Sequence, residues 1–187
     1  MTTTLYGLRF SGDVAHALAQ HQVELFRSFG LVSALALPPL IHLAVLRSAN
    51  EADDLTPHTL DTLRRQYTVK VQAADFAEPA QDVVGARCNT AAVTELSAAL
   101  IDAIAQEDTQ RAVVVPQLVL AWEQHQLASR SAVARIAAAV PTTEALWLTR
   151  FVVHSRADDW ALDCSWQIEY SRRLRATRRQ RDSDRRS

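Results

Sequence analysis

Residues 38–46 are Pro38-Pro39-Leu40-Ile41-His42-Leu43-Ala44-Val45-Leu46, a nearly continuous apolar run behind a pair of prolines. Such a run is typical of a strand that is buried on both faces. One polar side chain, His42, interrupts the run, and a buried imidazole needs either a hydrogen-bond partner or a functional role. The stretch therefore predicts a central strand that carries a candidate functional residue.

A second stretch of the same kind stands in the other half of the chain. Residues 113–122 read Val-Val-Val-Pro-Gln-Leu-Val-Leu-Ala-Trp, so Pro116 and one polar side chain, Gln117, again accompany an apolar run. Each half of the chain is thus expected to contain its own buried central strand.

The remaining segments alternate between helix and strand signals. Apolar runs and two-residue alternation predict strands over 5–10, 67–72, 83–88, 145–153 and 160–170. Apolar residues at helical spacing predict helices over 14–29, 56–66, 93–106 and 130–140. With the two central strands the order is βαβαββαβαββ, which indicates an α+β fold.

This order, with a proline-led central strand in each half, resembles the 2H phosphoesterase superfamily over residues 4–170. Residues 39–43 stand where that family has Pro-His-Ile-Thr-Leu, and residues 116–121 stand where it has Pro-His-Leu-Thr-Leu-Ala. The resemblance implies one domain over residues 1–171, built of two duplicated βαβ-type lobes whose antiparallel sheets face a central cleft. It also implies that a His and a Thr or Ser from each lobe act on a phosphate there.

Both motifs depart from the pattern of the family. The first reads Leu40-Ile41-His42 and the second reads Gln117-Leu118-Val119. Moving the first alignment by two residues places His42 at the His position but leaves Ala44 in place of the hydroxyl. Because one positioned acid or base contributes about 10²- to 10⁴-fold, the two-histidine reaction is not expected.

The candidate site follows from residues that alternate along these strands. His42 is the candidate catalytic group, with a satisfied core histidine as the alternative. Tyr6 and Arg9 lie on opposite faces of their strand, and we favour Tyr6 for the cleft, while Arg87 and Thr149 are weaker candidates. The expected ligand contacts are Tyr6, Leu40, Gln117, Val119 and Glu123.

The C-terminal end is strongly basic. Residues 172–186 hold eight Arg and two Asp, a charge of +6, so a net charge of −1 leaves the rest of the chain acidic. Residues 172–187 are expected to form a tail that is either only solubilising or a contact for RNA or an acidic protein. The candidate contacts are Arg172, Arg173, Arg175, Arg178 and Arg179.

Composition removes several classes of function. Cys88 and Cys164 lie far apart without a metal-ligand pattern, so neither a metal nor another cofactor is expected. No apolar run of membrane length and no signal peptide is present, which predicts a cytoplasmic protein without a membrane partner. Nineteen Arg beside one Lys, with much Ala, suggests a bacterial base composition.

Three functions follow. The first is a diverged protein of this fold whose cleft binds a small molecule or runs a different reaction, for example a biosynthetic one. The second is a non-catalytic module that binds RNA or protein through its basic tail. The least favoured is residual 2′,3′-cyclic phosphodiesterase or RNA ligase-like activity.

Overall fold

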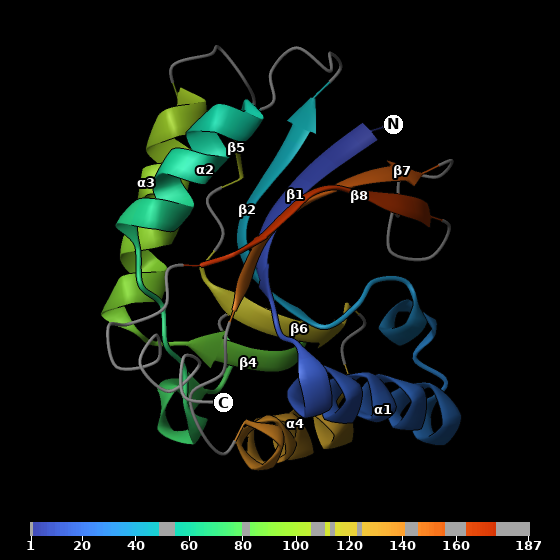
Figure 1. Cartoon of the computed structure of the whole chain (residues 1–187). Helices are drawn as coiled ribbons and strands as arrows, with labels where there is room; N and C mark the ends of the chain where they lie inside the picture. The colour runs from blue at the N-terminus through green and yellow to red at the C-terminus, as the bar shows by residue number, and fades with distance from the viewer. Residues whose placement is uncertain are drawn as a thin grey trace.

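The structure is a computed structural model, and it describes residues 2–48, 55–79, 83–105, 111–112, 115–122, 125–140, 146–155 and 164–174. Helices and antiparallel strands are mixed along the chain, and the predicted α+β class is confirmed (Figure 1). The helices are α1 (Gly12–Phe29), α2 (Pro57–Gln66), α3 (Ala91–Ala105) and α4 (Gln126–Ala139), with short 3₁₀ turns η1 (Val32–Leu35) and η3 (Ala73–Asp75).

One sheet of eight strands forms the centre of the described fold. The strands are β1 (Thr2–Arg9), β2 (Leu40–Ser48), β3 (Phe76–Ala77), β4 (Val84–Cys88), β5 (Arg111–Ala112), β6 (Gln117–Ala121), β7 (Trp147–Ser155) and β8 (Cys164–Arg173). Their order is β3-β4-β6-β2-β1-β7-β8, and β5 pairs with β2. The sheets of the two expected halves are joined because the central strands β2 and β6 pair directly. Figure 1 shows β4 and β6 running across the direction of β1, β7 and β8.

The helix ends follow from local sequence signals. Thr56 caps α2 by accepting a hydrogen bond on its hydroxyl from the Thr59 amide (3.2 Å), ahead of Pro57 at the first helical position. Gly30 ends α1 with a φ of 71°, a left-handed conformation that favours glycine. None of the described helices combines the length and the apolar character that crossing a membrane requires.

All four helices contribute to a core on one face of the sheet. Figure 1 shows α1 and α4 side by side beneath β4 and β6, and α2 and α3 side by side next to β2. From the central strands, Ile41, Leu43, Leu118 and Leu120 enter this core and are at most 2 % exposed. Burial of each such side chain stabilises the fold by about 1.5–3 kcal/mol.

One predicted strand is absent from the described fold, and the last strand runs further than expected. Residues 67–72 alternate in burial, with Val69 and Val71 buried and Lys70 exposed, but they form no strand, since alternation alone supplies no ladder partner. Strand β8 continues through Arg173, and Leu174 is buried in the core with its amide bonded to the Leu146 carbonyl (2.9 Å). The expected limit of the domain at residue 171 therefore falls inside the last strand.

Candidate functional site

Four residues from the central strands β2 and β6 form a square on the face of the sheet opposite the helices. Leu40 pairs with Val119 and His42 pairs with Gln117, so the first residue of each predicted motif faces the last residue of the other. Directly paired residues share a face of the sheet. We call Leu40, His42, Gln117 and Val119 the tetrad; each is at most 4 % exposed.

A β-bulge next to the tetrad places His42 and Ala44 on opposite faces of the sheet. Gly7 pairs with His42 whereas Tyr6 pairs with Ala44, so Leu43 is an extra residue on β2. The shifted alignment requires His42 and Ala44 to share a face, but Ala44 lies in the helix-side core. Leu40 and His42 therefore share a face of the sheet, whereas Ala44 lies on the other face.

His42 is a neutral imidazole. Burial lowers the pKa of His42 from 6.5 to about 3 because no charged group compensates for the lost hydration. The ring lies edge-on to Trp122, with centroids 5.0 Å apart. Its Nδ1 atom is buried and has no hydrogen-bond partner among the described residues. His42 can thus exchange one hydrogen bond with a ligand, but it carries no charge near neutral pH.

Polar residues extend the tetrad into a row across the sheet. From β8 to β4 the paired positions are Ser171, Thr149, Gly7, His42, Gln117 and Arg87. The hydroxyls of Thr149 and Ser171 lie 3.1 Å apart. Because each position is paired with the next, this row brings residues from β8, β7, β1, β2, β6 and β4 onto one face.

Two arginines flank the tetrad symmetrically. Arg9 on β1 pairs with Leu40, and Arg87 on β4 pairs with Gln117. Their Nε atoms are buried and have no hydrogen-bond acceptor among the described residues. A buried, unsatisfied donor carries a free-energy penalty of about 1–3 kcal/mol, and more when it is charged. An anion beside either guanidinium would remove that penalty.

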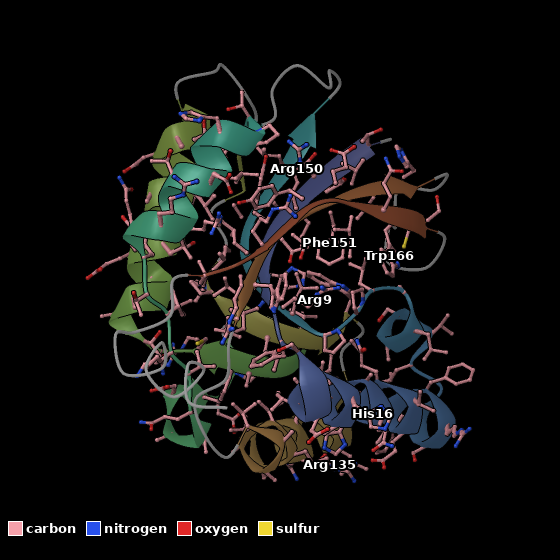
Figure 2. All side chains as sticks on the ribbon, in the orientation of Figure 1. Arg9, His16, Arg135, Arg150, Phe151 and Trp166 are labelled. Carbon is pink, nitrogen blue, oxygen red and sulfur yellow. The ribbon has the colours of Figure 1, made fainter. Side chains whose placement is uncertain are left out.

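Arg150, on the opposite face of β7, also has a buried Nε atom without an acceptor among the described residues, but its terminal guanidinium nitrogens are bonded. Its guanidinium donates to the Leu55 carbonyl (2.8 Å) and lies 2.8 Å from the Glu169 carboxylate. In Figure 2, Arg9 extends below Phe151 and Trp166, between the β7–β8 pair and β6. Arg150 is thus held in a structural ion pair, whereas Arg9 is directed into the tetrad side of the sheet.

An apolar cluster borders the tetrad on the side of Leu40. It consists of Leu5, Leu37, Leu40, Phe151 and Val153. The Trp166 ring packs edge-on against Phe151, with centroids 5.6 Å apart. A Cβ on Gly7 would clash with the end of the Leu40 side chain, so glycine at this position lets Leu40 lie across β1. The tetrad is therefore apolar at the Leu40 corner and polar at His42 and Gln117.

The structure places the other predicted site residues as follows. Tyr6 is fully buried in the helix-side core and its hydroxyl accepts a hydrogen bond from the Leu55 amide (3.1 Å), so Tyr6 lies on the face opposite the tetrad. The alternation of β1 puts Arg9 on the tetrad side instead. Glu123 lies outside the described residues.

Only part of the predicted basic contact belongs to the described fold. Arg172 and Arg173 are exposed at the end of β8, whereas Arg175, Arg178 and Arg179 lie outside the described residues. No group of three His, Cys, Asp or Glu side chains gathers as a metal site in the part of the chain that the structure describes. Burial raises the pKa of the Cys88 thiol to about 11, so this thiol is protonated at neutral pH.

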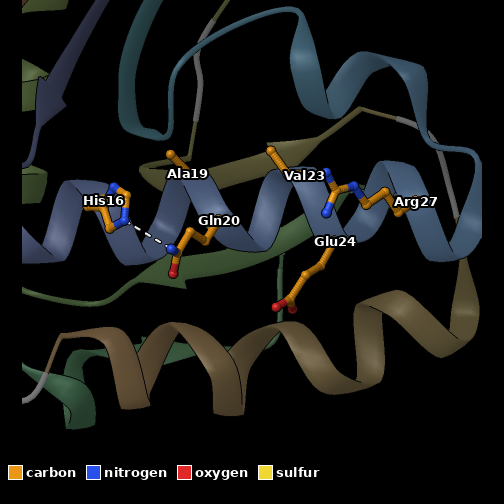
Figure 3. A pocket seen from close by; sticks show the side chains of 6 residues that line it. All are labelled: His16, Ala19, Gln20, Val23, Glu24 and Arg27. Atoms are coloured by element: carbon orange, nitrogen blue, oxygen red, sulfur yellow. Dashed lines mark hydrogen bonds between the residues drawn. The ribbon is translucent and has the colours of Figure 1, made fainter.

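A separate groove of about 450 Å³ lies on α1, away from the tetrad. Its lining residues are His16, Ala19, Gln20, Val23, Glu24 and Arg27 (Figure 3). The Gln20 amide and the His16 ring are 2.9 Å apart, and Glu24 is ion-paired with Arg135 of α4. All the lining residues belong to one helix, and the His16, Gln20 and Glu24 side chains are engaged with their neighbours.

Solved structures with this arrangement of elements are known. A crystal structure described as a phosphoesterase aligns with a TM-score of 0.55 and 13% identity, covering 94% of this chain and all of that one. The chain has the 2H phosphoesterase fold. Escherichia coli LigT in complex with 3′-AMP aligns with a TM-score of 0.51 and 10% identity, covering 94% of this chain and 99% of LigT. No family model and no curated protein matches the sequence.

These structural likenesses confirm the fold that the resemblance of the two proline-led strands implies. The sequence also indicated all four tetrad residues as motif positions, and the structure brings them together through the pairing of β2 with β6. Arg9 and Arg87 were less favoured from sequence, because the pairing of their strands with the motif strands is long-range. The alternation of side chains along a strand could have identified Arg9, because Arg9 is two residues from Gly7 and therefore lies on the same face of β1.

Proposed function

We propose that this protein binds a small anionic ligand on the tetrad side of the sheet, with Arg9 and Arg87 as the charged contacts and without two-histidine phosphodiester chemistry. The proposal treats the chain as a diverged 2H-fold protein whose site is reassigned. One observation carries it: two arginines flank the tetrad with buried Nε donors that have no acceptor in the described fold. A guanidinium binds carboxylate or phosphate oxygens through charge-assisted hydrogen bonds.

The chemistry of the tetrad supports binding over hydrolysis. A phosphodiester reaction of this fold needs two proton-transfer groups, and the tetrad offers one imidazole and one amide. An amide such as Gln117 has no pKa near neutrality, so it can donate a hydrogen bond but cannot act as a general acid. The lowered pKa of His42 also makes it a weak base. Leu40 and Val119 contribute only apolar contacts.

Ligand titration by calorimetry tests the proposal, with 3′-AMP, inorganic phosphate and uncharged adenosine as probes. We expect 3′-AMP or phosphate to bind and adenosine alone to fail. Loss of a hydrogen bond to a charged group corresponds to about 1.5–3 kcal/mol, or roughly 10- to 150-fold in affinity. Arg9→Gln and Arg87→Gln should each weaken binding by this amount.

Arg135→Gln is the matched control, because Arg135 lies on α4 and pairs with Glu24 away from the tetrad. This variant should bind like the parent protein. His42→Ala should weaken the same ligand by a smaller factor, since it removes one neutral hydrogen-bonding group. Unchanged affinity in the Arg9, Arg87 and His42 variants would refute the assignment of the site.

Turnover of 2′,3′-cyclic nucleotides provides a separate test of the chemistry. We expect no hydrolysis above the buffer rate, because the loss of two acid–base groups removes on the order of 10⁴- to 10⁸-fold. Hydrolysis that depends on His42 would overturn this part of the proposal and would favour residual phosphodiesterase activity instead.

The basic C-terminal end supports a second candidate function, contact with RNA or an acidic protein. Arg172 and Arg173 are exposed at the end of an edge strand and begin the arginine-rich segment. Neutralising phosphates releases counterions, so RNA binding should fall steeply with salt and vanish on truncation after Leu174. Tight RNA binding by the truncated protein would exclude the tail as the contact.

A further inference from the structure

We infer that the outer edge of β8 is a self-association surface, on which a second copy of this chain adds its own β8 in antiparallel orientation. This inference is independent of the proposed ligand. It begins from topology: β8 is the last strand in the sheet order, and β7 is its one partner among the strands that the structure describes. An edge strand presents unpaired N–H and C=O groups that another strand can bond.

The first half of β8 has the properties of an open edge. Residues Ser165, Trp166, Gln167, Ile168 and Glu169 are all exposed. Trp166 is 41 % exposed and Ile168 is 38 % exposed, which is unusual for such large apolar side chains on a strand. Neither Pro nor Lys, the residues that commonly protect sheet edges, occurs in the strand. The bulge at Glu169 ends the regular part.

The side chains of this segment are self-complementary. Cys164, Trp166 and Ile168 lie on the tetrad side of the strand, whereas Ser165 and Gln167 lie on the other side. In an antiparallel pair centred on Trp166, the tryptophans of two copies meet and Cys164 faces Ile168. Centring on Gln167 brings Trp166 opposite Ile168 instead. In either register, apolar side chains of one copy face apolar side chains of the other. Such cross-strand aromatic or aliphatic pairs stabilise sheets.

Charge selects the antiparallel orientation. Arg172 and Arg173 end the strand, and further arginines follow them in the sequence. A parallel pair in register would place these arginines side by side, and like charges directly opposite are destabilising. An antiparallel pair separates them by the length of a ten-residue strand, ~30 Å. A two-fold axis also closes the assembly at a dimer.

Apolar surface continues beyond the strand. The Cys164 thiol lies 3.9 Å from the Ala36 carbonyl, so the end of η1 is beside the start of β8. Val32 and Leu35 of η1 are 49 % and 52 % exposed. A second copy that docks along β8 can therefore cover more apolar area than the strand alone provides.

Sedimentation equilibrium of the full chain from ~1 µM to ~1 mM tests the inference over the range of weak association. We expect a reversible dimer. Trp166→Lys and Ile168→Lys should each weaken dimerisation at least ~10-fold, as substitutions at the centre of an interface do. Leu127→Lys is the matched control, because Leu127 is 64 % exposed on α4 and should leave the dimer intact.

Hydrogen exchange of the unmodified protein gives a second readout that needs no variant to fold. Amides within residues 165–168 should gain protection as concentration rises, and added salt should not weaken the dimer. A monomer at every concentration overturns the inference. So does a dimer that survives Trp166→Lys, that protects other segments only, or that dissociates in salt, the last result indicating contact through the arginine-rich end.

Discussion

The two faces of the central sheet bury different kinds of side chain. On the helix side, Ile41 and Leu118 are fully buried among apolar side chains. On the tetrad side, His42 and Gln117 are 1 % exposed although both are polar. The helix side thus satisfies the usual requirement for a core, whereas the tetrad side buries polar groups at a free-energy penalty.

The apolar side chains of the helix side therefore maintain the fold, whereas the polar side chains of the tetrad side are available for function. A core of apolar side chains is sufficient to hold the helices on the sheet, and the same fold accommodates different residues on the other side. Truncating a buried apolar side chain on the helix side should therefore change stability most, whereas changes to the polar tetrad residues should chiefly change ligand binding.

The largest effect is expected from Leu118→Ala on the helix side. Removing this fully buried side chain should lower the free energy of unfolding by ~2–5 kcal/mol, measured by urea denaturation. Leu127→Ala, at an exposed position on α4, should change it by less than ~0.5 kcal/mol. Equal losses in the two variants would mean that the helix side is not the principal core.

Gly7→Ala tests how tightly the apolar corner of the tetrad is packed. The added Cβ meets the end of Leu40 and stands 2.9 Å from the Ile41 carbonyl, so we expect a loss of ~1–3 kcal/mol. Leu40→Ala in the same background should recover part of it, which a double-mutant cycle measures. Gly85→Ala, whose Cβ meets the Leu118 carbonyl of the backbone, should not be rescued in this way.

The pH dependence of stability tests whether the His42 imidazole is buried and neutral. Its pKa is lowered from 6.5 to about 3, so between these values the unfolded chain binds a proton that the folded chain does not. Stability should therefore be lost as pH falls below 6.5, by about 1.4 kcal/mol per pH unit, or about 2 kcal/mol at pH 5. Unfolding of His42→Leu should lack this contribution, and an identical acid profile would contradict the buried, neutral assignment.

Particular residues show how far the sequence reaches. Thr56-Pro57 and Gly30 predicted helix ends correctly, because a cap acts within one turn of the chain. Residues 67–72 alternate as a strand would but remain outside the sheet, since a ladder requires a partner that local sequence does not specify. Tyr6 and Arg9 were known to face opposite sides, yet which side faced the tetrad depended on pairing with β2.

The sequence by itself determined the order of elements, the two buried central strands and the identity of the residues at the motif positions, because period and turn chemistry are local properties. The tertiary structure alone decided that β2 and β6 pair, that a bulge at Leu43 places Ala44 on the face opposite Leu40 and His42, and that Arg9 and Arg87 flank the tetrad. These features join residues far apart in the chain, and long-range pairing is selected by the packing of the whole sheet rather than by neighbours in sequence.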